Sequence, residues 1–380
     1  MRTVAFIQPK RLVFGKGCAT DCAAFLRSRD FLRPLFITAP ETRALAEPLI
    51  EAWGGPRAEI YDRVDSEPSV EMFEDALNRG EAFHPDVVVG LGGGSALDVA
   101  KLVAALLDSN QRIRDVFGLD LVEFRSVALV SLPTTSGTGS EVSPAAVLLD
   151  REERLKKGVV SQHLVPDAAF IDPLLTVSVP PGVTASTGLD ALTHCIEAYA
   201  NRHAHPLVDV YALEGMRLIA GHLERAVRNG EDIEARESMA LGSLNGGLCL
   251  GPVNTAAAHA LAYPLGGEFR VPHGLANAIL LPHVMEFNLS SMPQRYAQIA
   301  VALGAARAGD MFETARRGID KVRELSARAG IPRRLSDVGV PESAIPGMAA
   351  GAMKVTRLLN NNPRDVTLAD AERIYRHAFV

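Results

Sequence analysis

Four residues in the second half of the chain have the types and the spacing of a metal site. Asp190 and His194 stand four residues apart in GLDALTHCIEAY, so a helix would place both side chains on one face. His259 and His273 follow, fourteen residues apart, in AAAHALAYPLGGEFRVPHG. One carboxylate and three imidazoles suit a divalent cation such as Fe²⁺ or Zn²⁺. Such an ion acts as a Lewis acid on a substrate oxygen, and that is the chemistry predicted here.

The alternative to a metal site is two chance pairs, because Asp190 and His194 alone are also typical of an ion pair across one helical turn. The joint match of ligand types and spacings favours the metal. Zn²⁺ binds histidine-rich sites more tightly than Fe²⁺, so the ligands do not identify the metal. The remaining histidines show no ligand pattern and are assigned no role; they are His84, His163, His203, His205, His222, His283 and His377. His203 and His205 are expected in a solvated loop.

A glycine-rich segment, Gly92-Gly93-Gly94-Ser95, follows a fully apolar run directly and precedes a helical pattern. Glycines let the backbone approach a pyrophosphate closely, and the free N–H groups of a helix start favour negative charge. The alternative is an ordinary strand-to-helix turn capped by Ser95. Three consecutive glycines exceed what a cap requires, so Gly93, Gly94 and Ser95 are predicted to bind phosphate. The segment is not the GxGxxG fingerprint.

A second candidate loop runs from Pro133 to Glu141 and offers five hydroxyls and two glycines. It follows another apolar strand, and open α/β sheets bind ligands at the carboxyl ends of their strands. The alternative is a hydroxyl-rich loop that satisfies its own backbone. Two such loops at one sheet edge favour a shared ligand.

Strand-like and helical patterns alternate through the first half of the chain, which predicts a doubly wound parallel sheet. The expected strands are 35–38, 58–64, 87–91 and 127–132, and the expected helices are 42–53, 70–79 and 96–107. The N-terminal segment also alternates as strands do.

After a proline-containing linker, VSVPPGVT, apolar residues recur at helical spacing. We therefore predict a Rossmann-like dinucleotide-binding α/β domain over 1–178 and an all-helical metal-binding domain over 179–380. The expected helices of the second domain are 185–200, 207–228, 232–250, 254–263, 292–304, 310–329 and 367–378.

The composition of the chain limits the kinds of partner that the protein is expected to bind. Of the 380 residues, 47% are hydrophobic and 22% charged, with a formal net charge of -6, so a nucleic acid or an anionic membrane is not expected as partner. No apolar run has the length of a membrane span, and no signal peptide is evident. The four cysteines form no framework, so free thiols and a cytoplasmic location are expected. Cys195, next to His194, is predicted to be a core residue.

Five segments together resemble the iron-containing, group III alcohol dehydrogenase family: GGGSALDVAK, PTTSGTGSEVS, GLDALTHCIEAY, HALAYPLGGEFRVPHGLANAILLPHV and NNPRDVT. The resemblance covers nearly the whole chain. It implies a dinucleotide-binding α/β domain, a helical domain and a cleft between them. It also implies iron or zinc as the metal, NAD or NADP as hydride carrier, and a homodimer.

Residue by residue, the resemblance makes Asp190, His194, His259 and His273 the metal ligands, and Gly93, Gly94 and Ser95 the pyrophosphate binders. Thr134, Thr135 and Thr138 resemble contacts to the adenine and nicotinamide halves. Lys156 resembles the lysine that reaches the nicotinamide ribose, and Asp98 matches an acidic position without a clear role.

The chain departs from the family pattern at two positions. Tyr263 replaces a histidine that is a candidate proton carrier in many members, so Tyr263 becomes a candidate here, beside a ribose hydroxyl or a water. Ala39, in FITAPET, stands where NAD-preferring members carry an aspartate, and Glu41 follows two residues later. NADP therefore stays possible beside NAD.

The resulting prediction is a metal-dependent, NAD(P)-linked oxidoreductase that transfers a hydride between nicotinamide and a small alcohol or aldehyde. Two other enzymes on the same fold are alternatives. A dehydroquinate-synthase-like lyase regenerates its cofactor, and a maleylacetate-reductase-like enzyme works without metal. The complete ligand set argues against the metal-free reductase and against a non-catalytic binding module.

Overall fold

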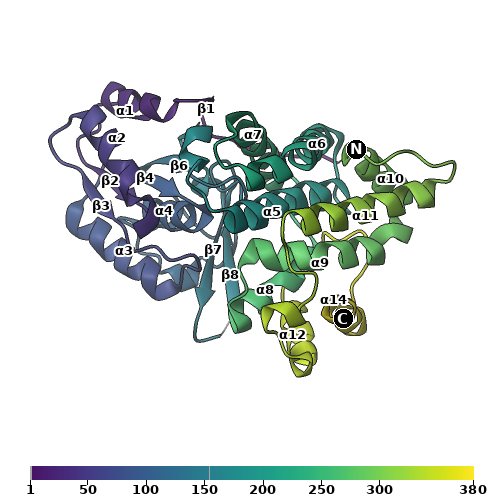
Figure 1. The fold of residues 1–380 in the computed structure, drawn as a ribbon. Helices are drawn as coiled ribbons and strands as arrows, with labels where there is room; N and C mark the ends of the chain where they lie inside the picture. The colour runs from purple at the N-terminus through teal and green to yellow at the C-terminus, as the bar shows by residue number, and fades with distance from the viewer. Residues whose placement is uncertain (1, 154) are drawn as a thin grey trace. The chain divides into compact units, whose positions relative to one another are not determined.

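The computed structural model describes residues 2–153 and 155–380. The chain forms two compact units (Figure 1). An α/β unit comprises residues 6–135 and 139–178, and a helical unit comprises residues 2–5, 136–138 and 179–380. Each unit is described by itself below.

The α/β unit is built on a parallel sheet of six strands in the order β1-β9-β6-β4-β2-β3. The fold class predicted from the sequence is therefore confirmed. The non-sequential order means that crossover helices connect the strands, as in doubly wound sheets. The strands are β1 (Arg11–Phe14), β2 (Pro34–Ile37), β3 (Glu59–Tyr61), β4 (Val87–Gly92), β6 (Ala128–Pro133) and β9 (Ala168–Ile171).

Two apolar cores, one on each face of the sheet, explain why the strands are apolar throughout. Val87 and Val89 of β4 pack in one core, whereas Val88 between them packs in the other, because side chains alternate along a strand. The first core includes side chains of α1 (Ala19–Ser28) and α2 (Ala46–Trp53). The second core includes those of α3 (Val70–Phe83) and α4 (Gly94–Leu106).

A second sheet of three strands also belongs to the α/β unit, in the order β5-β8-β7. It contains β5 (Gly118–Leu119), β7 (Ala145–Asp150) and β8 (Leu155–Val160). β7 and β8 pair antiparallel, with Leu149 opposite Lys156. The alternation of strand and helix patterns did not reveal this sheet.

The helical unit is organised around α5 (Pro181–Tyr199), which packs most extensively against α6 (Pro206–Arg228), α7 (Ile233–Leu250) and α9 (His273–Asn288). Nearly all of the C-terminal half of α5 is buried. A helix that is buried on all sides carries apolar side chains, or polar side chains with hydrogen-bond partners, around its whole circumference. The other helices are α8 (Ala257–Phe269), α10 (Pro293–Ala302), α11 (Met311–Arg328), α12 (Ile345–Ala352), α13 (Thr356–Leu359) and α14 (Leu368–Phe379).

Three local predictions differ in part from the structure. The boundary between the two units falls within VSVPPGVT, between residues 178 and 179, but the prolines belong to a helix, because Pro180 caps α5 and Pro181 begins it. Proline is well tolerated in the first helical turn, where its missing N–H is not needed. His205 does not lie in a solvated loop but is buried and caps α6, its Nδ1 accepting from the Leu207 N–H at 3.2 Å. The N-terminal segment was expected to form strands, and β1 (Arg11–Phe14) confirms this for its second half. Residues 2–9 form no strand; instead, the Arg2 guanidinium donates to the carbonyls of His203 and Pro252.

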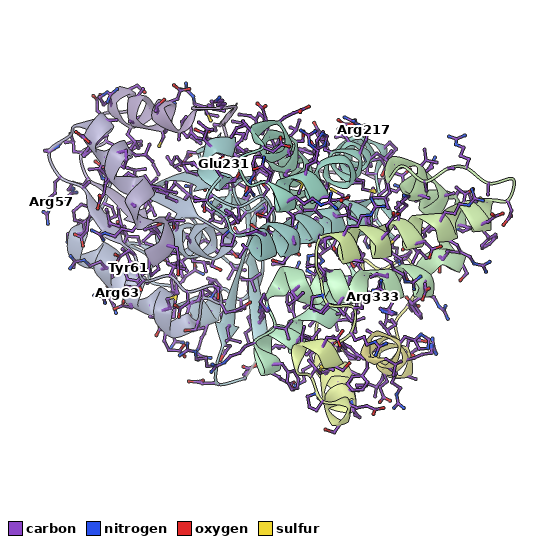
Figure 2. All side chains as sticks on the ribbon, viewed as in Figure 1. Arg57, Tyr61, Arg63, Arg217, Glu231 and Arg333 are labelled. Atoms are coloured by element: carbon purple, nitrogen blue, oxygen red, sulfur yellow. The ribbon has the colours of Figure 1, made fainter. Side chains whose placement is uncertain are left out.

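Charged side chains lie on the surface of both units. Figure 2 labels Arg57 and Arg63 in the α/β unit and Arg217, Glu231 and Arg333 in the helical unit, and all five are exposed. Among the helices described, none is both long and apolar enough to cross a membrane.

Candidate functional site

Helix α5 supplies Asp190 and His194 from one buried face. Their exposed fractions are 2% and 4%. A carboxylate in such a place is costly unless it is paired or coordinates a cation. The burial of Asp190 and His194 is therefore consistent with the metal site predicted from the sequence.

Helices α8 and α9 bring the other two predicted ligands to α5. His259 lies in the first turn of α8 and is 4% exposed, and His273 is the first residue of α9. The start of α9 approaches α5 closely because Gly274 has no side chain. A Cβ atom there would lie 2.4 Å from the Ser186 carbonyl oxygen, so any other residue would push His273 away.

Three donor groups converge at one point. Donor atoms of Asp190, His259 and His273 all lie within 4.8 Å of one another. The Asp190 Oδ1 atom is 3.6 Å from His259 Nε2 and 3.9 Å from His273 Nε2. His259 Nε2 is buried and has no hydrogen-bond partner among the described residues. A buried polar atom normally has a hydrogen-bond or metal partner, and a ring nitrogen without a hydrogen bond can coordinate a cation. These residues therefore fit a divalent ion.

His194 lies beside this group without belonging to it. Its ring stacks on that of His259, with 4.7 Å between ring centroids. Its Nδ1 atom is buried without a hydrogen-bond partner in the described chain. The predicted fourth ligand is thus adjacent to the three donors, and a role in coordination remains a prediction.

Burial and neighbouring charges favour an ionised Asp190 and a neutral His194. Burial alone would raise the pKa of Asp190, but His194, His273, His259 and the amide of Asn277 outweigh it and lower the pKa to about 2. Burial lowers the pKa of His194 to about 4 despite the neighbouring carboxylate. These are the protonation states that a metal requires of its ligands.

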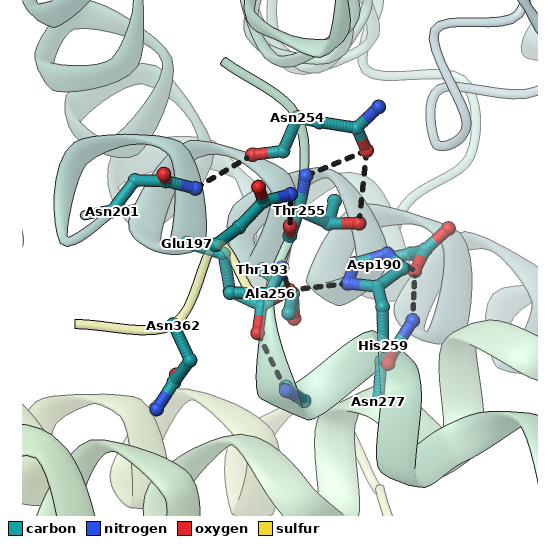
Figure 3. Close-up of polar contacts among 12 residues, drawn as sticks. Asp190, Thr193, Glu197, Asn201, Asn254, Thr255, Ala256, His259, Asn277 and Asn362 are labelled. Atoms are coloured by element: carbon teal, nitrogen blue, oxygen red, sulfur yellow. Dashed lines mark hydrogen bonds and ion pairs between the residues drawn. The ribbon is translucent and has the colours of Figure 1, made fainter. Parts of the chain in front are cut away.

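Glu197 was not predicted and is the residue that orients His259. Its Oε2 atom lies 2.6 Å from His259 Nδ1 (Figure 3). It also accepts the backbone N–H groups of Ala256 at 3.0 Å and Ala258 at 2.6 Å. An ionised carboxylate can only accept, so Nδ1 carries the proton and Nε2 is left with a free lone pair. The signal in the sequence was its position seven residues after Asp190, on the same helix face.

Two side-chain amides support the turn that precedes α8. Asn201 Nδ2 donates to the carbonyl of Asn254 at 3.1 Å (Figure 3), and Asn361 Nδ2 donates to the carbonyl of Thr255 at 2.8 Å. Asn254 has a φ of 74°, a left-handed conformation that asparagine tolerates better than most residues. Asn361 belongs to the NNPRDVT motif, so this motif supports the turn that leads into α8, the helix of His259.

Two further residues border the donors. Asn277 Nδ2 lies 2.7 Å from Asp190 Oδ1 and 3.2 Å from His273 Nε2. Tyr263 lies one turn after His259 on α8, is 6% exposed, and has its ring centroid 6.0 Å from that of His273. The sequence prediction that Tyr263 faces the same region agrees with this placement, and its role in proton transfer stays a prediction.

The predicted phosphate loop lies at the carboxyl end of β4. Gly93 caps α4 and Gly94 begins it, so the first N–H groups of this helix are available to an anion. Ser95 does not cap α4; its hydroxyl donates to the carbonyl of Ser66 at 2.7 Å. A Cβ atom on Gly92 would lie 2.7 Å from that of Ala96, so glycine is needed for this turn.

The hydroxyl-rich loop follows β6, the neighbour of β4. The Thr134 N–H donates to the carbonyl of Gly92 at 2.9 Å, and Thr135 Oγ1 would lie 3.5 Å from a Cβ atom on Gly93. The structure thus brings Thr134 and Thr135 to the glycine loop. Thr138 belongs to the three residues that group with the helical unit.

Asp98 braces the second loop from α4. Its carboxylate accepts from Ser140 Oγ at 2.6 Å and from the Val147 N–H at 2.9 Å. Burial raises its pKa, against the lowering effect of Lys101. These contacts indicate that Asp98 positions the loop.

The two remaining predicted cofactor residues lie elsewhere in the α/β unit. Ala39 follows β2 and is half-buried, with an extended backbone. Lys156 lies on β8 and forms an ion pair with Glu67 at 2.5 Å.

Family models match both parts of the chain. The model described as iron-containing alcohol dehydrogenase matches residues 9–173. The model described as the C-terminal part of the Fe-containing alcohol dehydrogenase family matches residues 184–379. Between them they cover most of both units.

Individual proteins agree with these models. The chain is 42% identical to long-chain-alcohol dehydrogenase 1 of Geobacillus thermodenitrificans over 329 residues, which is 86% of this chain and 83% of that protein. A crystal structure of 1,3-propanediol oxidoreductase superposes with a TM-score of 0.96 at 33% identity and covers 100% of both chains. Sulfoacetaldehyde reductase from Bifidobacterium kashiwanohense, solved in complex with NAD+, has a TM-score of 0.88 at 29% identity, over 100% of this chain and 99% of that one. The chain therefore belongs to the iron-containing alcohol dehydrogenase family.

Proposed function

We propose that the protein is a divalent-metal-dependent, NAD(P)-linked oxidoreductase that transfers a hydride between nicotinamide and a small alcohol or aldehyde. The observation that carries this proposal is the convergence of Asp190, His259 and His273, with the buried His259 Nε2 lacking a hydrogen-bond partner among the described residues. His194 is proposed as the fourth ligand. The relatives named above, which are alcohol and aldehyde enzymes by name, support the substrate class.

The metal supplies a Lewis acid that polarises a carbonyl or stabilises an alkoxide. The chain's own residues prepare the place for it. Glu197 keeps the proton of His259 on Nδ1, and Asn277 donates to Asp190 and so orients the carboxylate. Burial of these groups excludes water, which strengthens every electrostatic interaction with the ion. Iron is proposed from the family, with zinc as the alternative metal.

The cofactor is proposed to bind along the carboxyl edge of the large sheet. Gly93, Gly94 and the start of α4 would hold the pyrophosphate, helped by the helix dipole. Thr134 and Thr135 adjoin this loop, and we propose Thr138, Lys156 and Ala39 as further contacts. NAD is the first choice because a relative was solved with NAD+. The absence of an acidic side chain at Ala39 keeps NADP as a candidate.

Two further parts of the proposal concern the protein in the cell. All four cysteines are free and buried, which suits a reducing compartment, and we propose the cytoplasm. A homodimer is proposed from the family alone. The metal-free and lyase alternatives are disfavoured by the intact donor set and by the names of the relatives.

The test compares wild type with His273→Ala, and with His222→Ala as the control on α6. Metal content is measured by mass spectrometry, and alcohol-dependent NADH formation by absorbance. We expect His273→Ala to lose metal and on the order of 10²-fold or more of activity, since Lewis-acid stabilisation contributes several kcal/mol. His222→Ala should retain both. Full activity of a metal-free His273→Ala protein would refute the metal mechanism. Return of NAD unreduced after turnover would point to the lyase.

A further inference from the structure

A cavity of about 420 Å³ lies at the amino ends of three strands of the large sheet. Its lining includes Arg11, which begins β1, Ala128, which begins β6, and Asp167, which directly precedes β9. Because β9 pairs in parallel with both β1 and β6, these three amino ends share one edge of the sheet. The glycine loop follows the carboxyl end of β4, which is also parallel to β6, so that loop lies at the opposite edge. The cavity is therefore separate from the proposed cofactor site.

The charged side chains that line this cavity are mostly basic. They are Lys10, Arg11, Arg29, Arg125 and Asp167. Four cations and one carboxylate leave a formal charge of +3, whereas the whole chain carries -6. A concave site with one sign of charge attracts ligands of the opposite sign, and pockets for small molecules span roughly 300–1,000 Å³. The cavity thus has the charge and the size to take a small anion.

Arg125 is held in the lining by two contacts. Its Nη1 atom lies 3.0 Å from Asp167 Oδ2, and its Nη2 atom donates to the carbonyl of Val165 at 3.3 Å. The Arg125 side chain is 12% exposed, and Nη1 is buried without a hydrogen bond of suitable geometry to any described residue. Asp167 is shared, because its carboxylate also accepts from Lys10 Nζ at 3.2 Å and from the Leu129 N–H at 3.0 Å. Arg125 therefore presents a buried donor that a bound anion would satisfy.

Arg11 and Arg29 stack on one buried ring. Their guanidinium groups lie 5.5 Å and 5.6 Å from the ring centroid of Phe25, which is 5% exposed. Within the described parts of the chain, neither guanidinium pairs with a carboxylate. Stacking over a ring leaves the N–H groups at the edge of the guanidinium available. The two side chains are thus held beside the cavity with their donors unused.

We propose that this cavity binds a phosphate group, either as free phosphate or as part of a small phosphate monoester. The planar N–H fork of arginine matches two oxygens of a phosphate, and a dianion would offset most of the +3 charge. Phe31 is half-buried in the same lining and offers apolar surface to the organic part of a monoester. The site needs neither the metal nor NAD(P), so it goes beyond the proposed function.

The experiment measures the binding of inorganic phosphate, ribose 5-phosphate and uncharged ribose by calorimetry at pH 8, where a phosphate monoester is a dianion. The metal-containing protein is saturated with NADH, so that the glycine loop is occupied. The variants are Arg29→Met and the double variant Arg11→Met with Arg29→Met, which remove charge and keep much of the side-chain bulk. The control is Arg57→Met, because Arg57 also stacks on a ring, 4.9 Å from the centroid of Phe83, but lies outside the cavity lining (Figure 2).

We expect wild type and Arg57→Met to bind both phosphate compounds equally well and not to bind ribose. Affinity for these compounds should fall about tenfold in Arg29→Met and about a hundredfold in the double variant, as expected for lost hydrogen bonds to a charged group. Tighter binding of ribose 5-phosphate than of inorganic phosphate would identify a monoester as the ligand, and equal binding would identify free phosphate. Alcohol-dependent NADH formation should be unchanged in Arg29→Met, because this residue belongs to neither the metal site nor the cofactor site.

Three outcomes would overturn the inference. The first is that wild type binds neither phosphate compound at millimolar concentration. The second is that wild type and the double variant bind them equally, which would place the phosphate elsewhere, at the metal or at the glycine loop. The third is a lower molar mass of the double variant in light scattering, which would show that this face is an interface between copies of the chain. If the double variant is unfolded by circular dichroism, the folded single variant decides.

Discussion

Glu197 Oε2 and His259 Nδ1 lie 2.6 Å apart, and this contact determines which nitrogen of His259 faces the other donors. The same carboxylate accepts the N–H groups of Ala256 and Ala258 at the start of α8. One side chain therefore fixes both the tautomer of a proposed ligand and the helix that carries it. Carboxylates behind metal-bound histidines have this role in many metalloproteins.

The first prediction concerns Glu197→Gln. Glutamine keeps one acceptor oxygen but loses the charge, so the bond to His259 Nδ1 weakens and the ring orientation is less well defined. We expect metal affinity to fall by about 10–100-fold. Competition with a chelator of known affinity measures this. Glu214→Gln on α6, where the exposed carboxylate pairs with Arg217, is the control. Equal metal affinity in Glu197→Gln and wild type would show that the contact is not needed.

The second prediction concerns Tyr263. Its ring is nearly fully buried and lies 6.0 Å from the ring of His273 by centroids. If Tyr263 serves packing, Tyr263→Phe keeps the ring, and we expect metal content, turnover and pH profile close to wild type. A fall in turnover with metal retained would instead assign the proton to the hydroxyl. In that case Tyr263→His should restore turnover and move the acid limb of the pH–rate profile toward about 6.5.

The third prediction concerns the choice between NAD and NADP. Ala39 is the second residue after β2 and has an extended backbone. An aspartate there would place a carboxylate near a 2′-phosphate. We expect Ala39→Asp to raise the NAD-to-NADP ratio of kcat/KM by about tenfold or more, because like charges in contact cost several kcal/mol. Glu41→Gln tests whether the exposed carboxylate two residues later already contributes. An unchanged ratio in Ala39→Asp would remove Ala39 from the ribose site.

The fourth prediction concerns the thiols. Burial raises the pKa values of Cys18, Cys22 and Cys195 to about 12, and raises that of Cys249 well above its usual value. The thiolate is the reactive form, so at pH 8 the native protein should react with a thiol reagent only slowly. All four thiols should react once the protein is unfolded in guanidinium chloride. Rapid labelling of the native protein would contradict this.

Features that depend on the order of neighbouring residues, such as apolar strands and helix-spaced ligands, could be predicted from the sequence. Buried strands such as β4 are apolar at every position, and the strand-to-helix rhythm implied a doubly wound sheet that the structure confirms. The ligand candidates Asp190 and His259 could be predicted because their residue types suit a metal and each is followed by a histidine at a ligand-like spacing. The helix at α9 was not predicted, because its apolar residues surround the helix and give no amphipathic period.

Other features depend on tertiary contacts that no pattern records. Glu197 shares a helix face with Asp190, but a glutamate in that position is equally typical of a surface ion pair. Glu197 becomes the partner of His259 only because α8 packs close to α5 in the folded chain. The pairing of Glu67 with Lys156 likewise requires the β7–β8 hairpin to meet the segment after β3. His205 was misjudged because burial of a helix cap depends on neighbouring elements.

The bond from Asn361 to the turn before α8 has a consequence for biosynthesis. This turn leads into α8, which carries His259, yet its supporting amide comes from Asn361, about a hundred residues later in the chain. Chains emerge from the ribosome N-terminus first, and units fold as their residues become available. The α/β unit ends at residue 178 and can form while translation continues. The proposed metal ligands acquire this support only after Asn361 has left the ribosome, so we expect the ion to be loaded after that segment has been synthesised.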